Sequence, residues 1–239
     1  SELTLTLEAS DVGLWMRDVN VIDSPAQGIR DILDMMPTDT EENWVDIAGR
    51  LNNLPAAIAG YIETLKLGIE RGITPAKRQV REVFEQAKKH GASDGFIGAA
   101  ALADDQAIPA SVRADLATGA RVSAEAYETL AGFLSNELFP AAVEDDGVGR
   151  EIYALQSRRF LGAEIDLDET YEWGIEELAR MTEEQEAVAS EIKPGASVAE
   201  AIAILDADPA RTLHGTAALQ EWMQTTSDAA VRALDGVHF

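Results

Sequence analysis

The chain has 239 residues, with 43 acidic and 19 basic side chains, a formal net charge of −24 and no cysteine. Disulfide bonds, thiolate nucleophiles and cysteine zinc sites are therefore excluded, and the charge argues against nucleic acid as the main partner because nucleic-acid binding depends on Lys and Arg. The longest nearly apolar run, Phe96 to Ala103, is too short to span a bilayer and no signal peptide is recognisable, so we expect a soluble protein without a membrane partner, with the cytoplasm as the favoured location.

The N-terminal segment is predicted to be a strand. Leu3, Leu5 and Leu7 alternate with Thr4 and Thr6, and a period of two is typical of β-structure. A partner strand is not evident in the sequence. Ala-rich stretches recur elsewhere among Glu, Leu and Arg, which are good helix formers. We therefore predict an all-α fold, an irregular array of about eight or nine helices with at most this one short strand.

Helical signals begin at residue 24. Ser24 is a predicted N-cap and Pro25 takes the first helical position, where its missing N–H has no cost. Pro37 is the expected end of this first helix.

The clearest helix is predicted over residues 38–72. Thr38 and Glu41 have the spacing of a capping box, and apolar residues then recur at intervals of three and four. These residues are Trp44, Ile47, Leu51, Leu54, Ile58, Tyr61 and Leu65. Pro55 lies inside this stripe, and because proline has no backbone N–H to donate, we expect the helix to kink or split near Leu54.

A basic segment spans Lys66 to Lys89, in a sequence that is otherwise acidic. It contains a third predicted helix, which begins at Thr74 and Pro75 and ends at Gly91 in a left-handed conformation. The basic side chains could grip an acidic ligand or an acidic surface of the same fold, and the second interpretation is favoured. His90 is interpreted as a helix-end residue rather than a ligand.

Five more helices are predicted downstream, over residues 109–138, 152–160, 166–192, 197–205 and 219–234. Small residues between 117 and 126 predict a close helix crossing. Two of the starts carry capping boxes, Asp166 with Glu169 and Ser197 with Glu200. The expected organisation is a single helical domain over residues 1–239, with a sub-boundary near residue 104 or 145.

Motifs of known catalytic chemistry are missing from the sequence. The histidines, His90, His214 and His238, are isolated from one another, and neither a Gly-x-Ser-x-Gly elbow nor a phosphate-binding loop occurs. Pairs of acidic residues are numerous, and at this density they are interpreted as a solvated face rather than as acid–base catalysts. We assign no catalytic residue.

Arg158 and Arg159, close in sequence to Tyr153, are the candidate substrate-binding residues. A guanidinium group can hold a carboxylate, such as a peptide C-terminus, through two parallel hydrogen bonds. With about 100° per helical residue, both arginines point away from Tyr153, so only long side chains could converge with the phenol. The favoured alternative is an ion pair with Glu151, Glu164 or Asp166.

Several runs of residues, in consistent order along nearly the whole chain, resemble one family. These runs are Ile32–Pro37, Arg50–Pro55, Gly68–Pro75, Tyr127–Leu134, Pro140–Ala142, Gly149–Tyr153 and Leu167–Ala179. Together they resemble a large bacterial family known as domain of unknown function 885.

This resemblance implies a function. Complete members of the family are similar to helical zinc metallopeptidases, with a His-Glu motif and further histidines downstream of the matched region. The chain ends at Phe239, before that motif would begin, so the resemblance implies no metal ligand and no cofactor in this chain, and zinc in the complete protein. It implies the helical, substrate-covering part of a zinc-dependent peptidase or hydrolase, inactive alone, whose substrate is peptide-like.

The alternative function is a non-catalytic helical module for binding or oligomerisation. A fragment of a hydrolase is expected to associate with its missing catalytic half or with a companion chain. Helices that have lost their neighbours expose apolar stripes, so a homo-oligomer is also expected.

Overall fold

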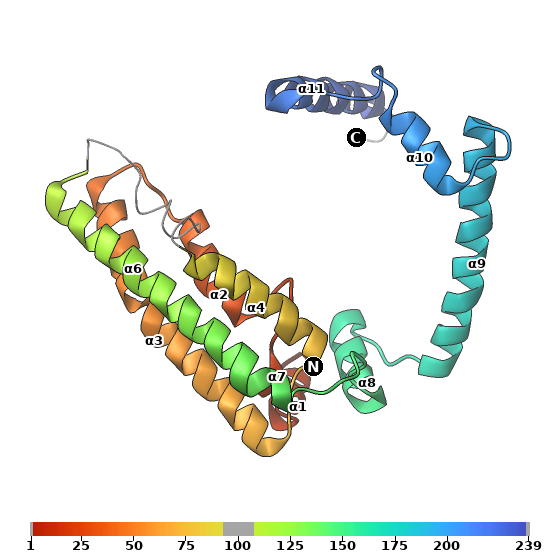
Figure 1. Cartoon of the computed structure of the whole chain (residues 1–239). Coiled ribbons are helices and arrows are strands. Elements are labelled where there is room, and N and C mark those ends of the chain that lie inside the picture. The colour runs from red at the N-terminus through yellow and green to blue at the C-terminus, as the bar shows by residue number, and fades with distance from the viewer. Residues whose placement is uncertain (1, 93–107, 238–239) are drawn as a thin grey trace. The chain divides into compact units, whose positions relative to one another are not determined.

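The computed structural model describes residues 2–92 and 108–237, and within these ranges the fold is all-α, as predicted (Figure 1). The one approach to a sheet in these ranges is an isolated bridge between Ala76 and Val143. The chain divides into two compact units, Ser1–Ile165 and Asp166–Phe239. Residue 145, one predicted sub-boundary, lies within the first unit. Residue 104, the other, lies outside the described residues, as does the apolar run Phe96 to Ala103.

The N-terminal segment is a helix, α1 (Glu2–Asp11), so the strand prediction is wrong. The Thr6 hydroxyl donates to the Glu2 carbonyl oxygen one turn earlier, a bond that lets threonine sit in a helix. A period of two produces a strand only where another strand can accept its hydrogen bonds, and α1 packs against helix α8 (Arg150–Leu161) instead. Leu3 and Leu7 are exposed, so their alternation does not mark a buried face.

Helix α2 (Pro25–Asp31) continues into a 3-10 turn, Ile32–Met35, and is followed by the long helix α3 (Glu41–Arg71). The predicted cap at Ser24 is present, with Gln27 completing the capping box. The cap of α3 is Thr40 with Asn43, two residues after the predicted Thr38. Both caps satisfy backbone N–H groups that the first helical turn leaves without a partner.

Four further elements complete the first unit's core: α4 (Lys77–Gly91), α6 (Ala110–Phe133), the π-helical segment Leu134–Leu138 and the short α7 (Phe139–Ala141). Figure 1 shows α3 and α6 running alongside each other, and α4 also contacts α6. The predicted apolar stripe of α3 is buried here. The largest fully buried side chains are Leu51, Ile58, Leu65, Val80, Val83, Leu116, Tyr127, Leu130, Leu134 and Leu138.

Pro55 does not split α3, because α6 replaces the hydrogen bond that proline removes. In an unbroken helix the residue 55 N–H would donate to the Leu51 carbonyl oxygen, and Pro55 has no such donor. The buried Ser123 hydroxyl of α6 donates to that oxygen at 2.8 Å. Gly119, one turn earlier, makes this approach possible, since a Cβ there would lie 2.6 Å from the Leu51 Cβ. The predicted close crossing is therefore the α3–α6 contact.

Two buried tyrosines fasten the N-terminal segment onto this core. The Tyr61 hydroxyl donates to the Asp18 carbonyl oxygen at 2.7 Å, and the Tyr127 hydroxyl to the Ala26 carbonyl oxygen at 2.8 Å. Burial raises the pKa of both phenols further above neutral pH.

The conformation of Gly91 differs from the prediction. It is the last helical residue of α4, and it does not have the left-handed conformation predicted for it. A Cβ at this position would lie 2.8 Å from the Glu128 Cγ and 3.3 Å from the Ala124 carbonyl oxygen. The glycine is therefore required by the close contact of α4 with α6 rather than by a turn.

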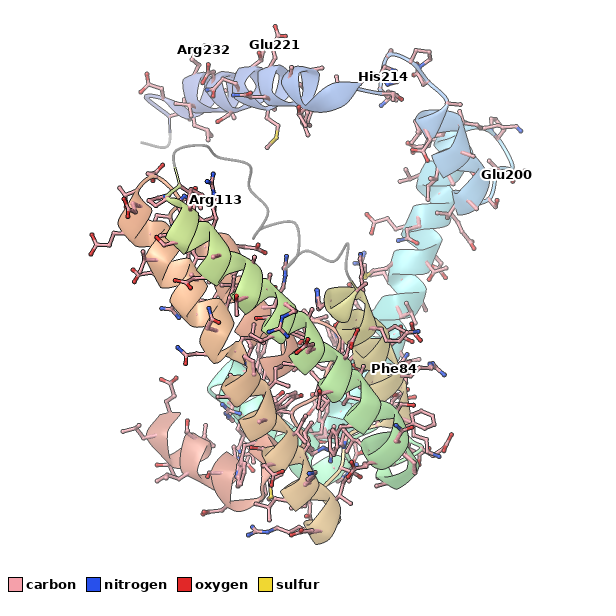
Figure 2. The ribbon with its side chains drawn as sticks, turned by 60° about the vertical axis from the view of Figure 1, so that its left-hand side comes forward. Phe84, Arg113, Glu200, His214, Glu221 and Arg232 are labelled. Carbon is pink, nitrogen blue, oxygen red and sulfur yellow. The ribbon has the colours of Figure 1, made fainter. Side chains whose placement is uncertain are left out.

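The second unit contains α9 (Leu167–Ile192), α10 (Val198–Asp206) and α11 (Gly215–Leu234). The Asp166 side chain caps α9, and Ser197 with Glu200 forms the predicted capping box of α10, where Figure 2 shows Glu200 at the start of the helix. Only Ala189, Ala196 and Ala201 are buried among its described residues. These helices are well specified locally but share almost no core.

Candidate functional site

A groove between α1 and α8 contains both candidate arginines. Its volume is about 850 Å³, and its lining includes Leu5 and Thr6 of α1 with Arg158, Arg159 and Phe160 of α8. Helix α8 ends at Leu161, with Gly162 as a left-handed cap, and its last turn lines the groove together with the start of α1. Cationic side chains in the last turn are favourable because they oppose the negative end of the helix dipole.

The two arginines have different partners. Arg158 forms an ion pair with Glu8 of α1, with 2.5 Å between Nη2 and Oε2. Arg159 donates to the Gln156 side-chain oxygen at 2.9 Å, and no carboxylate in the described ranges forms an ion pair with it. The predicted partners Glu151, Glu164 and Asp166 are wrong for Arg158, since the acid that binds it comes from α1. Arg159 is thus the exposed member of the pair, and Gln156 is its hydrogen-bond partner.

Tyr153 is not part of the groove lining, although it lies on the same helix. Its side chain is 55% exposed, and at about 100° per residue along α8 it points away from both arginines. The structure therefore brings Arg158 and Arg159 together and leaves Tyr153 apart from them.

The α1 side of the groove was missed by reasoning from the sequence. Leu5, Thr6 and Glu8 belong to the segment that was interpreted as a strand. Phe160 was also missed; it directly follows the arginine pair and is 90% exposed, which is unusual for so large an apolar side chain. An aromatic residue beside two arginines in the last turn of a predicted helix is the sequence signal from which Phe160 could have been included in the candidate site.

The basic segment 66–89 pairs with acids of its own fold, as favoured from the sequence. Lys77 binds Glu144 at 2.6 Å and Arg78 binds Asp146 at 2.9 Å, where backbone hydrogen bonds hold residues 75–77 against Val143. At the other end of α4, Lys88 Nζ lies 5.1 Å from the centre of the Phe84 ring (Figure 2). Five of the seven basic side chains in this segment therefore have a carboxylate partner within the fold.

The described residues do not provide a zinc site. His90 lies in the last turn of α4, with its ring edge-on to the Tyr127 ring and 5.3 Å between ring centres. Burial lowers the pKa of His90, and the nearby Arg30 adds to this effect. His214 precedes α11 in the other unit, and His238 lies outside the described residues. Within ranges 2–92 and 108–237, no three His, Asp or Glu side chains are placed to hold a metal ion.

A second groove, of about 480 Å³, lies between α9 and α10. Its lining is mainly apolar: Met181, Val188, Ile192, Val198, Ile202 and Leu205. Its polar lining residues are Arg180, Glu184 and Gln185, and Arg180 and Glu184 form an ion pair with each other. In the described part of the chain, none of the helices combines the length and hydropathy needed to cross a membrane.

These features define an all-α protein with an arginine-lined groove and a separate set of exposed amphipathic helices. The chain matches the model of the family described as "Bacterial protein of unknown function (DUF885)" over residues 1–239, and it belongs to that family. No curated protein matches the chain.

Among solved structures, the chain is similar to "the putative lipoprotein from Colwellia psychrerythraea". The two share 17% sequence identity with a TM-score of 0.69, so the fold is common to both. The match covers 91% of this chain and 40% of that one, so this chain spans less than half the length of the related structure.

Proposed function

We propose that the chain is the helical, substrate-covering part of a larger zinc-dependent peptidase or related hydrolase. The main observation in favour of this proposal is that the helices of the second unit expose their apolar faces. Trp173, Leu178, Trp222 and Met223 are all more than half exposed. Apolar area of this extent is normally covered by other polypeptide.

Two further facts support the proposal. The similar fold belongs to a chain more than twice as long, and the resemblance of the sequence runs is to proteins similar to zinc metallopeptidases. The described side chains include no group of three that could hold a metal ion, so the zinc ligands would have to come from elsewhere in the protein. The groove between α1 and α8 would then form part of the substrate surface, with Arg159 receiving a carboxylate.

The decisive experiment compares the 239-residue chain with the same protein at its natural length. We expect one tightly bound zinc ion and hydrolysis of a peptide mixture from the natural-length protein, and neither from the chain alone. Metal content is measured by mass spectrometry and cleavage by peptide sequencing. One zinc ion held by the isolated chain, or a metal-free and inert natural-length protein, would contradict the proposal.

The role of the arginines has its own test in the natural-length protein. Arg159→Ala should lower kcat/KM by about 10- to 100-fold on a peptide with a free C-terminal carboxylate, the value of a charge-assisted hydrogen bond, and much less on the amidated peptide. Arg158→Ala should have a smaller effect because Glu8 already binds this side chain. Arg150→Ala, on the same helix but outside the groove lining, is the matched control. Equal losses on both peptides would show that the arginines are structural.

A non-catalytic binding or oligomerisation module is the second candidate function. The apolar groove between α9 and α10 favours it, because such a groove can accept a helix without any catalytic group. This function predicts a natural-length protein that has no peptidase activity and retains a protein partner through gel filtration.

A further inference from the structure

The first half of α9 carries an apolar stripe without cover in its unit. Tyr171, Ile175, Leu178 and Met181 recur at intervals of three and four, and are 71%, 52%, 62% and 47% exposed. In the second half of the same helix, α10 packs against the stripe, where Ala189 is 2% exposed although Val188 and Ile192 remain 51% and 38% exposed. The stripe therefore has a contact with α10 in its second half, and its first four residues are all about half exposed or more.

Glutamates border this stripe on both sides. At about 100° per residue, Glu172 and Glu186 lie toward one edge, and Glu177 and Glu184 toward the other. Arg180 bridges Glu177 and Glu184 at 2.6 and 2.9 Å, so that edge remains negative overall. Glu172 and Glu186 have no ion-pair partner among the described side chains. An apolar surface with these borders favours a cationic neighbour.

The charge also argues against the neighbours that this chain itself could supply. Residues 166–239 contain 16 acidic and four basic side chains, a formal charge of −12, so a second copy would bring like charges together. Helix α11 has Glu221 and Asp228 against Arg232, so it offers no positive border either. The similar solved structure is much longer than this chain, which makes further polypeptide of the same protein the source that the comparison supports.

We propose that residues 171–181 of α9 form the docking surface for an amphipathic helix bordered by Lys or Arg, from the part of the protein outside these 239 residues. This inference rests on the proposed function only in placing the chain within a larger protein. The docked helix would fill the uncovered stripe with its apolar face and place its basic side chains against Glu172 and Glu186. The contact follows the pattern of a helix packed along a heptad-like seam with charged borders.

Hydrogen exchange followed by mass spectrometry tests the surface directly. In the natural-length protein the amides of residues 171–181 should exchange at least about 10-fold more slowly than in the 239-residue chain, because docking suppresses local opening. Equal exchange in the two proteins would overturn the inference. Protection that disappears on dilution would identify a second copy or a separate protein as the occupant, and would overturn it as well.

Charge reversal then tests the chemistry of the occupant. Glu172→Lys with Glu186→Lys should return the exchange of residues 171–181 in the natural-length protein to within about threefold of the isolated chain. Glu176→Lys with Glu191→Lys makes the same change in net charge on the side of α9 that faces away from the stripe, and should leave protection intact. Circular dichroism of the isolated chains shows whether each variant keeps its helices. Equal protection of residues 171–181 in both double variants would overturn the inference that the docked helix is cationic.

The outcomes separate this inference from the proposed function. A zinc-containing, active natural-length protein with an unprotected α9 would overturn the docking surface and leave the proposed function standing. A protected α9 in a metal-free, inert natural-length protein would overturn the proposed function and leave the docking surface standing.

Discussion

The two compact units differ in how many large side chains their helices bury against one another. In Ser1–Ile165, the helices α3, α4 and α6 share a core in which Leu65, Val80 and Tyr127 are fully buried. In Asp166–Phe239, the side chains of Asp166 and Ser197 cap α9 and α10, yet the only buried residues in the described range are three alanines. Caps and periodicity thus determine where a helix lies, whereas burial of large side chains determines whether it is stable.

Separating the units should give the largest effect. We expect residues 1–165 to unfold cooperatively in urea, and residues 166–239 alone to lose more than half of the helical circular dichroism signal that their structure would give. Isolated helices are marginal in water without an apolar face to pack against. A cooperative, fully helical 166–239 segment would show that the second unit has a sufficient core of its own.

Within the first unit, two glycines of α6 should respond in opposite directions to the same substitution. Gly119→Ala puts a Cβ 2.6 Å from the Leu51 Cβ and should cost about 1–3 kcal/mol, because the α3–α6 contact has to separate. Gly132→Ala meets nothing within 4 Å and should stabilise the chain by about 0.4–1 kcal/mol through helix propensity. The free energy of unfolding is measured in urea. Equal signs would mean that the helix crossing is looser than the structure shows.

The hydrogen bond that compensates for Pro55 can be tested with a double-mutant cycle. Ser123→Ala should cost about 1–3 kcal/mol because it leaves the buried Leu51 carbonyl oxygen without a donor. In the Pro55→Ala background, residue 55 regains an N–H that can reach this oxygen, so the same Ser123→Ala change should cost less. Additive costs, measured by urea unfolding, would mean that Ser123 acts through packing alone.

Local signals were enough to predict most of the helices. The stripe of α3 and the capping box of Ser197 and Glu200 each depend on residues within a few positions of one another, so they were readable without tertiary information. The strand prediction failed because Leu and Thr fit either structure and the choice depends on a neighbour, here α8. The family was recognisable from ordered runs of residues, which need no structure.

Long-range contacts could not be predicted in the same way. Ser123 and Leu51 are 72 positions apart, and Arg158 and Glu8 are 150 apart, so neither pair leaves a spacing to recognise. Gly91 looked like a helix stop because glycine serves both as a left-handed cap and as a site of close packing. For the candidate site, the arginines were visible in the sequence but the groove and its α1 side were not.

The smallest expected effect concerns α8, which has features of both units. It belongs to the first unit, but Leu155 is its only buried described residue, and the Arg158–Glu8 pair is its charged link to α1. Side chains that are 36% and 41% exposed are well screened by water, so a double-mutant cycle of Arg158→Ala and Glu8→Ala should give a coupling of about 0.2–1 kcal/mol.

This coupling should shrink in high salt, because added ions screen exposed charges. It is best measured from hydrogen exchange of α8 amides, which reports opening of this helix rather than unfolding of the core. A strong, salt-independent coupling would show that α8 is held as firmly as α3 and α6. Zero coupling with rapid exchange would instead show that α8, like the helices of the second unit, is stabilised by little burial of its own.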